Sequence, residues 1–265
     1  MLGTVAHAVR NGKMTVSRKF RRNRKSVNET PASLLTTMSH EKDKEAAAKA
    51  AMQFVHDGMV LGLGTGSTAL FAIRMLGERV KDGLRIAGIA TSTGSEKLAA
   101  EANIPLTDFD HTQTIDVTID GADEFDPKLN LIKGGGGALL REKIVASASR
   151  QVVIIADSSK QVATLGKFPL PVEVIGFAQA LIARKISALG ATVKLRQGAD
   201  GKAYITDEGH HILDCSFGSI ADPVGLARQL SAMPGIVEHG LFIGMAGVIL
   251  VSKDGAVEEL RRAKE

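Results

Sequence analysis

The sequence predicts an α/β fold, in which a Rossmann-like domain with a mostly parallel sheet is joined to a second, smaller α+β domain of the ferredoxin-like type. Short apolar runs alternate with helical segments in the first part of the chain, which is typical of a parallel sheet covered by helices. A β-α-β-β-α-β order follows, which indicates the smaller domain. The 265 residues, 44% hydrophobic and 23% charged, are enough to bury both cores.

The expected elements of the larger domain begin with a helix over residues 41–56, which is rich in strong helix formers and ends before the turn Asp57-Gly58. Strands and helices then alternate. The expected strands are residues 59–64, 85–90, 115–120 and 151–156, and the expected helices are residues 67–80, 95–103 and 138–148. Within 115–120, Ile115, Val117 and Ile119 alternate with polar residues, so this strand has one polar face.

The pattern changes at the proline-rich residues 168–171, where the smaller domain begins. Its expected strands are residues 172–175, 191–196, 203–206, 211–215 and 236–238, and its expected helices are residues 178–189 and 222–232. We expect residues 241–252 to form one last strand, which returns to the first domain. We therefore expect residues 39–167 and 241–265 to form the Rossmann-like domain and residues 168–240 the smaller one.

The net charge of +4 is unevenly distributed, because residues 1–37 hold eight Lys and Arg residues against Glu29 alone. We expect residues 1–38 to be a disordered basic extension, upstream of a true start at Met38. An organellar leader and a nucleic-acid-binding arm are the alternatives for this tail. The remaining chain carries a net charge of −3, so the body of the protein predicts no nucleic-acid partner.

Two further features exclude classes of protein. Cys215 is the only cysteine, which rules out a disulfide framework and a zinc site with several thiolates, and its apolar surroundings predict a small buried side chain. No apolar run approaches the roughly 18 residues that a membrane span needs. The chain therefore predicts no membrane partner, and a reducing compartment suits it.

Polar loops follow four of the expected strands, at residues 64–68, 91–95, 120–123 and 157–160. Because ligands of open α/β sheets bind outside the carboxyl ends of the strands, these loops predict one shared site. The loop Gly64-Thr65-Gly66-Ser67-Thr68 opens a helix, whose N-terminal amides favour an anion. It lacks the third glycine of a dinucleotide fingerprint and the lysine of a P-loop, so a single phosphate on a small sugar is the natural ligand.

Asp120 and Asp123 stand on either side of Gly121-Ala122, which aims both carboxylates at one pocket. Paired carboxylates suit proton transfer between hydroxyl groups or the binding of a polyol. A divalent metal held with Asp116, Glu124 and Asp126 is a second interpretation, and helix or turn caps are a third.

Lys133 precedes four consecutive glycines, Gly134–Gly137, and Glu142 follows in the next helix. Four glycines cost backbone entropy, and such a loop usually allows the backbone to approach a ligand closely. Lys133 is then suited to neutralise charge that develops on a substrate oxygen, with Glu142 as a base. The alternative for Glu142 is an ordinary exposed glutamate on a helix.

Taken in order, GLGTGSTA, TSTGSEKLA, DVTIDGADEFD, LIKGGGGALLREKIVA and ADSSKQV closely resemble type A ribose-5-phosphate isomerase, and the likeness continues through LGKFPLPVEV and GLFIG to the C-terminus. The resemblance implies a Rossmann-like domain with a small α+β domain, a homodimer or dimer of dimers, and a cytoplasmic enzyme without metal or cofactor. It implies the interconversion of ribose 5-phosphate and ribulose 5-phosphate through a cis-enediol(ate), in the non-oxidative pentose phosphate pathway.

The resemblance also implies roles for individual residues. Glu142 matches the general base, Asp120 and Asp123 match carboxylates that hold sugar hydroxyls and assist proton transfer between oxygens, and Lys133 matches a group that stabilises the enediolate. The other implied substrate-binding residues are Thr65, Gly66, Ser67, Thr68, Gly121, Ala122, Gly134, Gly135, Gly136 and Lys160, with Lys44 near the phosphate. A non-catalytic sugar-phosphate-sensing module on the same fold is the alternative function.

Overall fold

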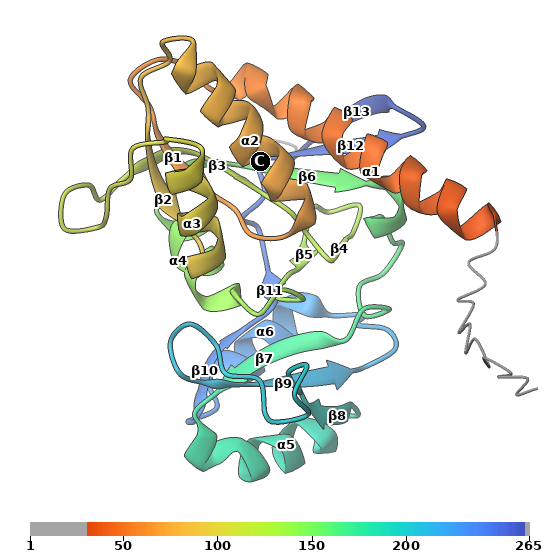
Figure 1. The fold of residues 1–265 in the computed structure, drawn as a ribbon. Coiled ribbons are helices and arrows are strands. Elements are labelled where there is room, and N and C mark those ends of the chain that lie inside the picture. Colours follow the sequence, from red (N-terminus) through yellow and green to blue (C-terminus); the bar gives the residue numbers. More distant parts are fainter. Residues whose placement is uncertain (1–30, 263–265) are drawn as a thin grey trace, which may run out of the picture.

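The computed structural model describes residues 31–262, with side chains from residue 40 onward. A six-stranded sheet, in the order β13-β12-β6-β3-β1-β2, runs through the upper part of the molecule (Figure 1). Neighbouring strands pair in parallel except β13, which is antiparallel to β12. Its strands are β1 (Val60–Leu63), β2 (Ala87–Ala90), β3 (Ile115–Asp120), β6 (Ser149–Asp157), β12 (Val248–Lys253) and β13 (Ala256–Arg261). The mostly parallel sheet predicted from the sequence is confirmed.

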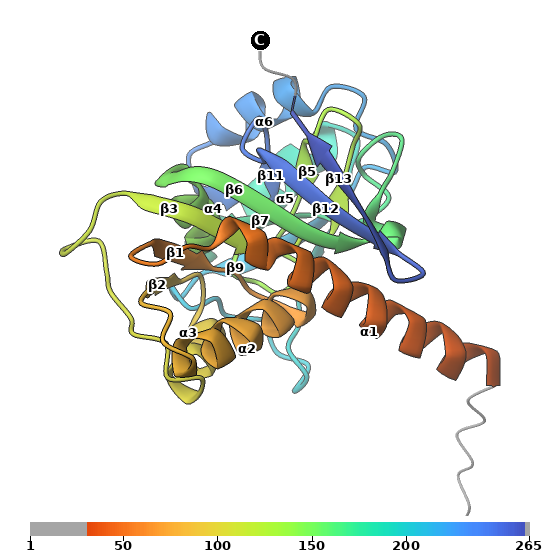
Figure 2. The same cartoon turned by 90° about the horizontal axis from the view of Figure 1, so that it is seen from above.

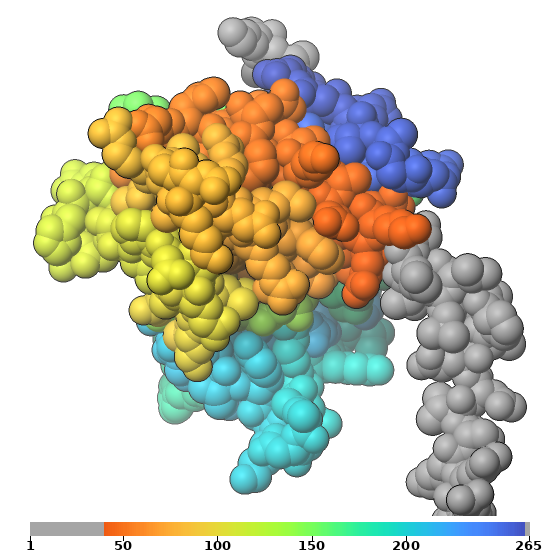
Figure 3. Space-filling model, turned by 45° about the horizontal axis from the view of Figure 1, so that its top comes forward, coloured from red at the N-terminus to blue at the C-terminus, as the bar shows by residue number. Residues whose placement is uncertain are grey.

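Helices α1 (Pro31–Ala51), α2 (Ser67–Lys81) and α3 (Thr93–Glu101) cover one face of this sheet (Figure 2). Helix α4 (Leu139–Ser147) lies on the other face. Alternate side chains of β6 serve the two faces, because Val153 and Ile155 pack toward α1 and α2 while Ile154 packs on the opposite side. In the space-filling view, the part of α1 from residue 40 onward, α2 and α3 form a continuous surface above the smaller domain (Figure 3).

The smaller domain consists of a four-stranded antiparallel sheet, in the order β10-β7-β9-β8, and two helices. We call this unit the small domain. Its elements are β7 (Leu170–Val174), α5 (Gln179–Ala188), β8 (Thr192–Leu195), β9 (His211–Ser216), α6 (Pro223–Ser231) and β10 (Ile236–His239). The β-α-β-β-α-β order and the strand order are those of a ferredoxin-like unit, as predicted. Cys215 is fully buried in its core, which raises the pKa of the thiol to about 12.

A third sheet, which the sequence did not predict, consists of three strands of two residues each: β4 (Glu124–Phe125), β5 (Leu131–Ile132) and β11 (Leu241–Phe242), in the order β11-β5-β4. The single strand predicted over residues 241–252 is therefore wrong. The chain leaves β11, passes Gly244 with its positive φ of 71°, and enters β12 only at Val248. Strand β13 was not expected either.

Two other expectations need correction. Residues 203–206 do not form a strand, because only isolated bridges at Ala203 and Ile205 join them to neighbouring segments, and the Thr206 amide closes a turn on His210 O. Helix α1 begins at Pro31 rather than at Glu41, which shortens the predicted basic extension; proline is well suited to the first turn of a helix. The rest of that predicted extension, residues 1–30, lies outside the described residues. The division of the chain at residues 168 and 241 stays a prediction.

Between residues 31 and 262, none of the helices is both long and apolar enough to cross a membrane.

The contact between α2 and α3 depends on a glycine, which gives a first prediction. A Cβ atom at Gly77 would lie 2.6 Å from Ala102 Cβ and 2.8 Å from Ala102 O, whereas one at Gly94 would lie 3.6 Å from the nearest atom. Gly77→Ala should lower the free energy of unfolding by about 1 kcal/mol or more, although alanine is the better helix former. Gly94→Ala, the matched control, should not lower it. Urea denaturation measures both, and a Gly77→Ala protein as stable as the wild type would contradict the prediction.

Candidate active site

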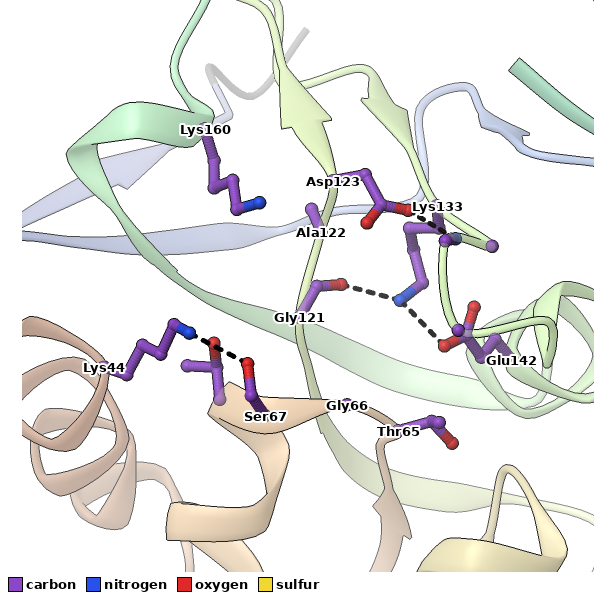
Figure 4. A pocket seen from close by; sticks show the side chains of 14 residues that line it. Lys44, Thr65, Gly66, Ser67, Gly121, Ala122, Asp123, Lys133, Glu142 and Lys160 are labelled. Atoms are coloured by element: carbon purple, nitrogen blue, oxygen red, sulfur yellow. Dashed lines mark hydrogen bonds and ion pairs between the residues drawn. The ribbon is translucent and has the colours of Figure 1, made fainter. Parts of the chain in front are cut away.

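The carboxyl ends of the parallel strands open into a cleft at which loops from both faces of the sheet meet (Figure 4). Its lining consists of Lys44, Thr65, Gly66, Ser67, Thr68, Gly121, Ala122, Asp123, Lys133, Gly134, Gly135, Gly136, Glu142 and Lys160. These are all of the residues predicted from the sequence except Asp120. Asp120 lies behind the lining, in contact with Lys133.

Lys133 is the centre of a buried cluster of charges. Its Nζ atom lies 3.0 Å from Asp120 Oδ2 and 3.5 Å from Glu142 Oε1, and it donates a hydrogen bond of 2.6 Å to Gly121 O. Burial by itself would lower the pKa of Lys133, but the negative charges of Asp120 and Glu142 outweigh burial and raise it. Lys133 therefore stays protonated, and so positively charged, in the interior of the protein.

Glu142 lies in the first turn of α4 and is only 4% exposed, so the alternative of an ordinary exposed glutamate is wrong. Its Oε1 atom faces Lys133, while Oε2 is buried and has no hydrogen-bond partner among the residues described. Burial raises the pKa of Glu142 to about 8; Lys133 opposes the shift, and Asp120 and Asp123 add to it. An unpartnered carboxylate oxygen in the wall of a cleft is free to take a proton from a ligand.

Backbone amides hold the two aspartates. Asp120 Oδ1 accepts hydrogen bonds from Thr65 N (3.0 Å) and Gly121 N (2.7 Å), and Asp123 Oδ2 accepts one from Gly135 N (2.7 Å). A Cβ atom at Gly64 would lie 2.3 Å from Asp120 Oδ1, and one at Gly135 would lie 2.5 Å from Asp123 Oδ1. These two glycines are therefore required for the backbone to approach the carboxylates closely.

The other end of the cleft is suited to an anion. Lys44 and Lys160 lie there together with Ser67, which is the first residue of α2 (Figure 4). Lys44 Nζ donates a hydrogen bond of 3.0 Å to Ser67 Oγ. The helix N-terminus, two ammonium groups and the hydroxyls of Ser67 and Thr68 together provide donors for a phosphate.

The polar loop after β2 supports the site from behind instead of lining it. Thr65 Oγ1 lies within 2.7–2.9 Å of the hydroxyl oxygens of Thr91, Ser92 and Ser95, and Ser95 Oγ also donates to Gly64 O. The hydroxyl-rich composition of this loop indicated a role near the site. The sequence alone did not distinguish contact with a ligand from support of Thr65.

The acidic residues that a metal site would need are bound elsewhere. Asp116 pairs with Arg150, Glu124 accepts bonds from Gly166 N and Phe168 N, and Asp126 caps the turn to Asn130. Over residues 40–262, no group of three or more His, Cys, Asp or Glu side chains is arranged to hold a metal ion. The arrangement does not fit the interpretation of Asp120 and Asp123 as metal ligands together with those three residues.

Sequence reasoning missed two residues of the small domain that contact the glycine loop. Arg196 Nη1 donates to Gly134 O (2.8 Å) and Gly135 O (3.1 Å), and Tyr204 Oη donates to Gly136 O (3.4 Å). Neither residue belongs to a recognisable motif, and both lie more than fifty positions away from the loop. Only the packing of the small domain brings them to it.

The fold is Rossmann-like, and its cleft has an acid–base cluster at one end and anion-binding groups at the other. These features indicate an enzyme that catalyses proton transfer within a small phosphorylated substrate. Comparison with known proteins is more specific. The family model of ribose 5-phosphate isomerase A (phosphoriboisomerase A) matches residues 87–255. The chain belongs to this family, as the sequence motifs predicted.

Relatives and solved structures agree with this assignment. Ribose-5-phosphate isomerase A of Parvibaculum lavamentivorans is 56% identical over 82% of this chain and 96% of its own, and that of Nitrobacter hamburgensis is 51% identical over 83% and 97%. A D-ribose-5-phosphate isomerase in complex with phospho-erythronic acid has a TM-score of 0.82 at 41% identity, covering 84% of this chain and 99% of its own. The isomerase of Methanocaldococcus jannaschii has a TM-score of 0.80 at 41% identity, with 83% and 99% covered.

The raised pKa of Glu142 predicts a pH-dependent stability. Between the ordinary pKa of 4.5 and about 8, the folded protein holds a proton that the unfolded chain has lost. The contribution of Glu142 to the free energy of unfolding should therefore fall as pH rises through this window, by up to about 1.4 kcal/mol per pH unit. Denaturation of the wild type and of Glu142→Gln at pH 5 to 8.5 measures the difference between them. Glu101→Gln, an exposed control, should follow the wild type. Parallel curves for wild type and Glu142→Gln would contradict the assignment of the shift.

Proposed function

We propose that this protein is an aldose–ketose isomerase that interconverts D-ribose 5-phosphate and D-ribulose 5-phosphate. The observation that carries the proposal is the unpartnered Oε2 of Glu142, buried beside Lys133 in a cleft whose far end is rich in phosphate donors. The names of the relatives support this substrate. So does the phospho-erythronic acid bound to a structural neighbour, because it is a phosphorylated sugar acid.

The reaction moves one carbon-bound proton between adjacent carbons. In the forward direction, Glu142 takes the proton from C2 of the open-chain aldose, and the electron pair of that C–H bond forms the C1–C2 double bond of the enediolate. The same carboxylic acid then returns the proton to C1, while the carbonyl forms at C2. A base of raised pKa suits both halves, because it both accepts the proton and releases it to the enediolate.

Negative charge develops on the C1 oxygen when the C2 proton leaves. Lys133 is a buried ammonium group beside Glu142 whose raised pKa keeps it charged, and the residues of the glycine loop line the same cleft. Such groups stabilise the enediolate because they are already oriented when the charge appears. Asp123 lines the cleft and is placed to exchange protons with substrate oxygens and to hold a hydroxyl. Asp120 orients Lys133 and the Thr65 amide from behind.

The phosphate occupies the opposite end in this proposal, where Ser67, Thr68, Lys44 and Lys160 provide donors. This placement directs the reacting carbons toward Glu142. A non-catalytic sugar-phosphate sensor would gain nothing from a buried carboxylate without a partner, since burial of such a group costs free energy. The homodimer and the cytoplasmic location implied by the family resemblance stay predictions.

The direct test of this function is the isomerisation of ribose 5-phosphate by purified wild-type protein and by Glu142→Gln. The substitution keeps the size of the side chain but removes the base. We expect kcat to fall by about 10²–10⁴-fold with KM changed only a few-fold. Glu101→Gln on the surface of α3 serves as the control and should behave like the wild type. Absence of turnover in folded wild-type protein, or wild-type kcat in Glu142→Gln, would overturn the proposal.

The anion-binding end predicts a different kinetic signature. Lys160→Met should raise KM for ribose 5-phosphate by about tenfold or more, because a charged hydrogen bond to the phosphate is lost, and should change kcat much less. Inorganic phosphate should inhibit the variant more weakly by a similar factor. Lys167→Met, at an exposed lysine outside the cleft, is the matched control. Unchanged KM and phosphate inhibition in Lys160→Met would remove this residue from the phosphate site.

A further inference from the structure

Arg196, which directly follows β8 of the small domain, is held in a defined orientation. Its Nε donates to Asp214 Oδ2 (3.0 Å), and its Nη2 donates to Asp214 Oδ1 of the same carboxylate. The ring of Tyr204 lies with its centroid 5.9 Å from the guanidinium carbon. Because the paired edge of the guanidinium is occupied by Asp214, Nη1 is left to reach across to the other domain.

The Nη1 atom of Arg196 contacts the glycine loop of the candidate active site. Arg196 Nη1 donates to both Gly134 O (2.8 Å) and Gly135 O (3.1 Å), and Tyr204 Oη donates to the next carbonyl oxygen, Gly136 O. Three successive peptide carbonyls are therefore bound from the side of the small domain. A loop of glycines has little conformational preference of its own. Gly134 O also accepts a hydrogen bond from Gly137 N within the loop (3.0 Å), whereas, among the residues described, the Gly135 and Gly136 carbonyls are held from the small domain alone.

The orientation of the carbonyls determines that of the amides. None of the peptide bonds described is cis, and in a trans peptide the C=O and N–H groups point in opposite directions. The peptide between Gly134 and Gly135 shows this, since its oxygen accepts from Arg196 and its N–H donates to Asp123 Oδ2 in the wall of the cleft. The next peptide also directs its oxygen to Arg196, which turns the Gly136 N–H to the same side as Asp123.

The Gly136 N–H has no acceptor among residues 40–262, whose side chains the structure describes, and Gly136 is an exposed residue in the lining of the cleft. We infer that Arg196 is a positioning residue, which presents the Gly136 amide to the oxygen that becomes negatively charged during isomerisation. This inference rests on the proposed function, because it assigns a donor to the enediolate of that reaction. Arg196 itself lies on the far side of the loop from the cleft and acts through the backbone.

The matched control comes from a second bridge between the same two domains. Thr93 in α3 donates from both N and Oγ1 to Asp207 of the small domain (2.9 and 3.0 Å), without touching the glycine loop. If Arg196 only held the two domains together, loss of the Thr93–Asp207 contact would have the same effect as loss of Arg196. If Arg196 orients the Gly136 amide, only the loss of Arg196 affects the reaction.

The experiment compares Arg196→Met, Arg196→Lys and Asp207→Ala, which removes both bonds of the second bridge, with the wild type. The readouts are kcat and KM for ribose 5-phosphate and the inhibition constant of phospho-erythronic acid. That compound probes charge stabilisation because its carboxylate carries the negative charge that the neutral aldehyde lacks. We expect Arg196→Met to lose about 10–100-fold in kcat, to keep KM within about threefold, and to bind phospho-erythronic acid more weakly by a factor close to the loss in kcat. Arg196→Lys, which cannot pair with Asp214 and both carbonyls together, should fall in between. Asp207→Ala should keep all three constants.

Wild-type kcat in folded Arg196→Met would overturn the inference, as would a change in KM alone or an equal loss of kcat in Asp207→Ala. If Arg196→Met does not fold, Arg196→Lys decides, because reduced kcat at unchanged KM supports the inference and unchanged kcat contradicts it. The proposed function is judged separately, by wild-type turnover and its loss in Glu142→Gln.

Discussion

The burial of Glu142 beside Lys133 and Asp120 is the interaction on which the rest of the site depends. When Glu142 is ionised, two carboxylates share one ammonium group and the cluster lacks one positive charge; one oxygen of Glu142 has no partner in the described structure. Ions removed from water in this way lower stability unless hydrogen bonds and opposite charges compensate. The fold compensates Asp120 with two backbone amides and Lys133 with Gly121 O, and leaves Glu142 only partly compensated. Because burial of the ionised form of Glu142 is not fully compensated, the pKa of Glu142 stays high and its ionised form binds a proton readily.

Each member of this cluster comes from a different element. Asp120 ends β3, Glu142 lies in the first turn of α4, and Lys133 directly follows the two-residue strand β5. The small three-stranded sheet therefore holds the backbone of Lys133 near the end of β3. The amide of Lys133 donates to Gly240 O (2.9 Å), and the ring of Phe242 in β11 lies 5.5 Å from Lys133 Nζ. The junction between the two domains is thus part of the active site.

The sequence predicted what local periodicity and dense motifs encode. The alternation in residues 115–120 indicated β3 correctly, and the run of four glycines between Lys133 and Glu142 pointed to the cleft that both residues line. Strands β4, β5 and β11 could not be predicted, because two residues carry no period and their stability comes from pairing with distant segments. The burial of Glu142 was also hidden, since an Arg-Glu-Lys triplet on a helix is typical of an exposed surface. Arg196 was missed for a related reason: its partners are backbone carbonyls, and any sequence has those.

The distribution of cations along the cleft suits the proposed function, in which a dianionic substrate enters a cleft whose Glu142 end has a deficit of positive charge when Glu142 is ionised. Lys133 is only 3% exposed and its ammonium group is already engaged by Asp120, Glu142 and Gly121 O, so an incoming phosphate cannot readily displace these partners. Lys44 and Lys160 are more accessible and lie at the other end. A phosphate bound beside Lys133 would neutralise the charge that the enediolate needs and would raise the pKa of Glu142 further. In the proposed reaction, the accessible lysines at the far end would therefore orient the substrate and keep the phosphate charge away from Glu142.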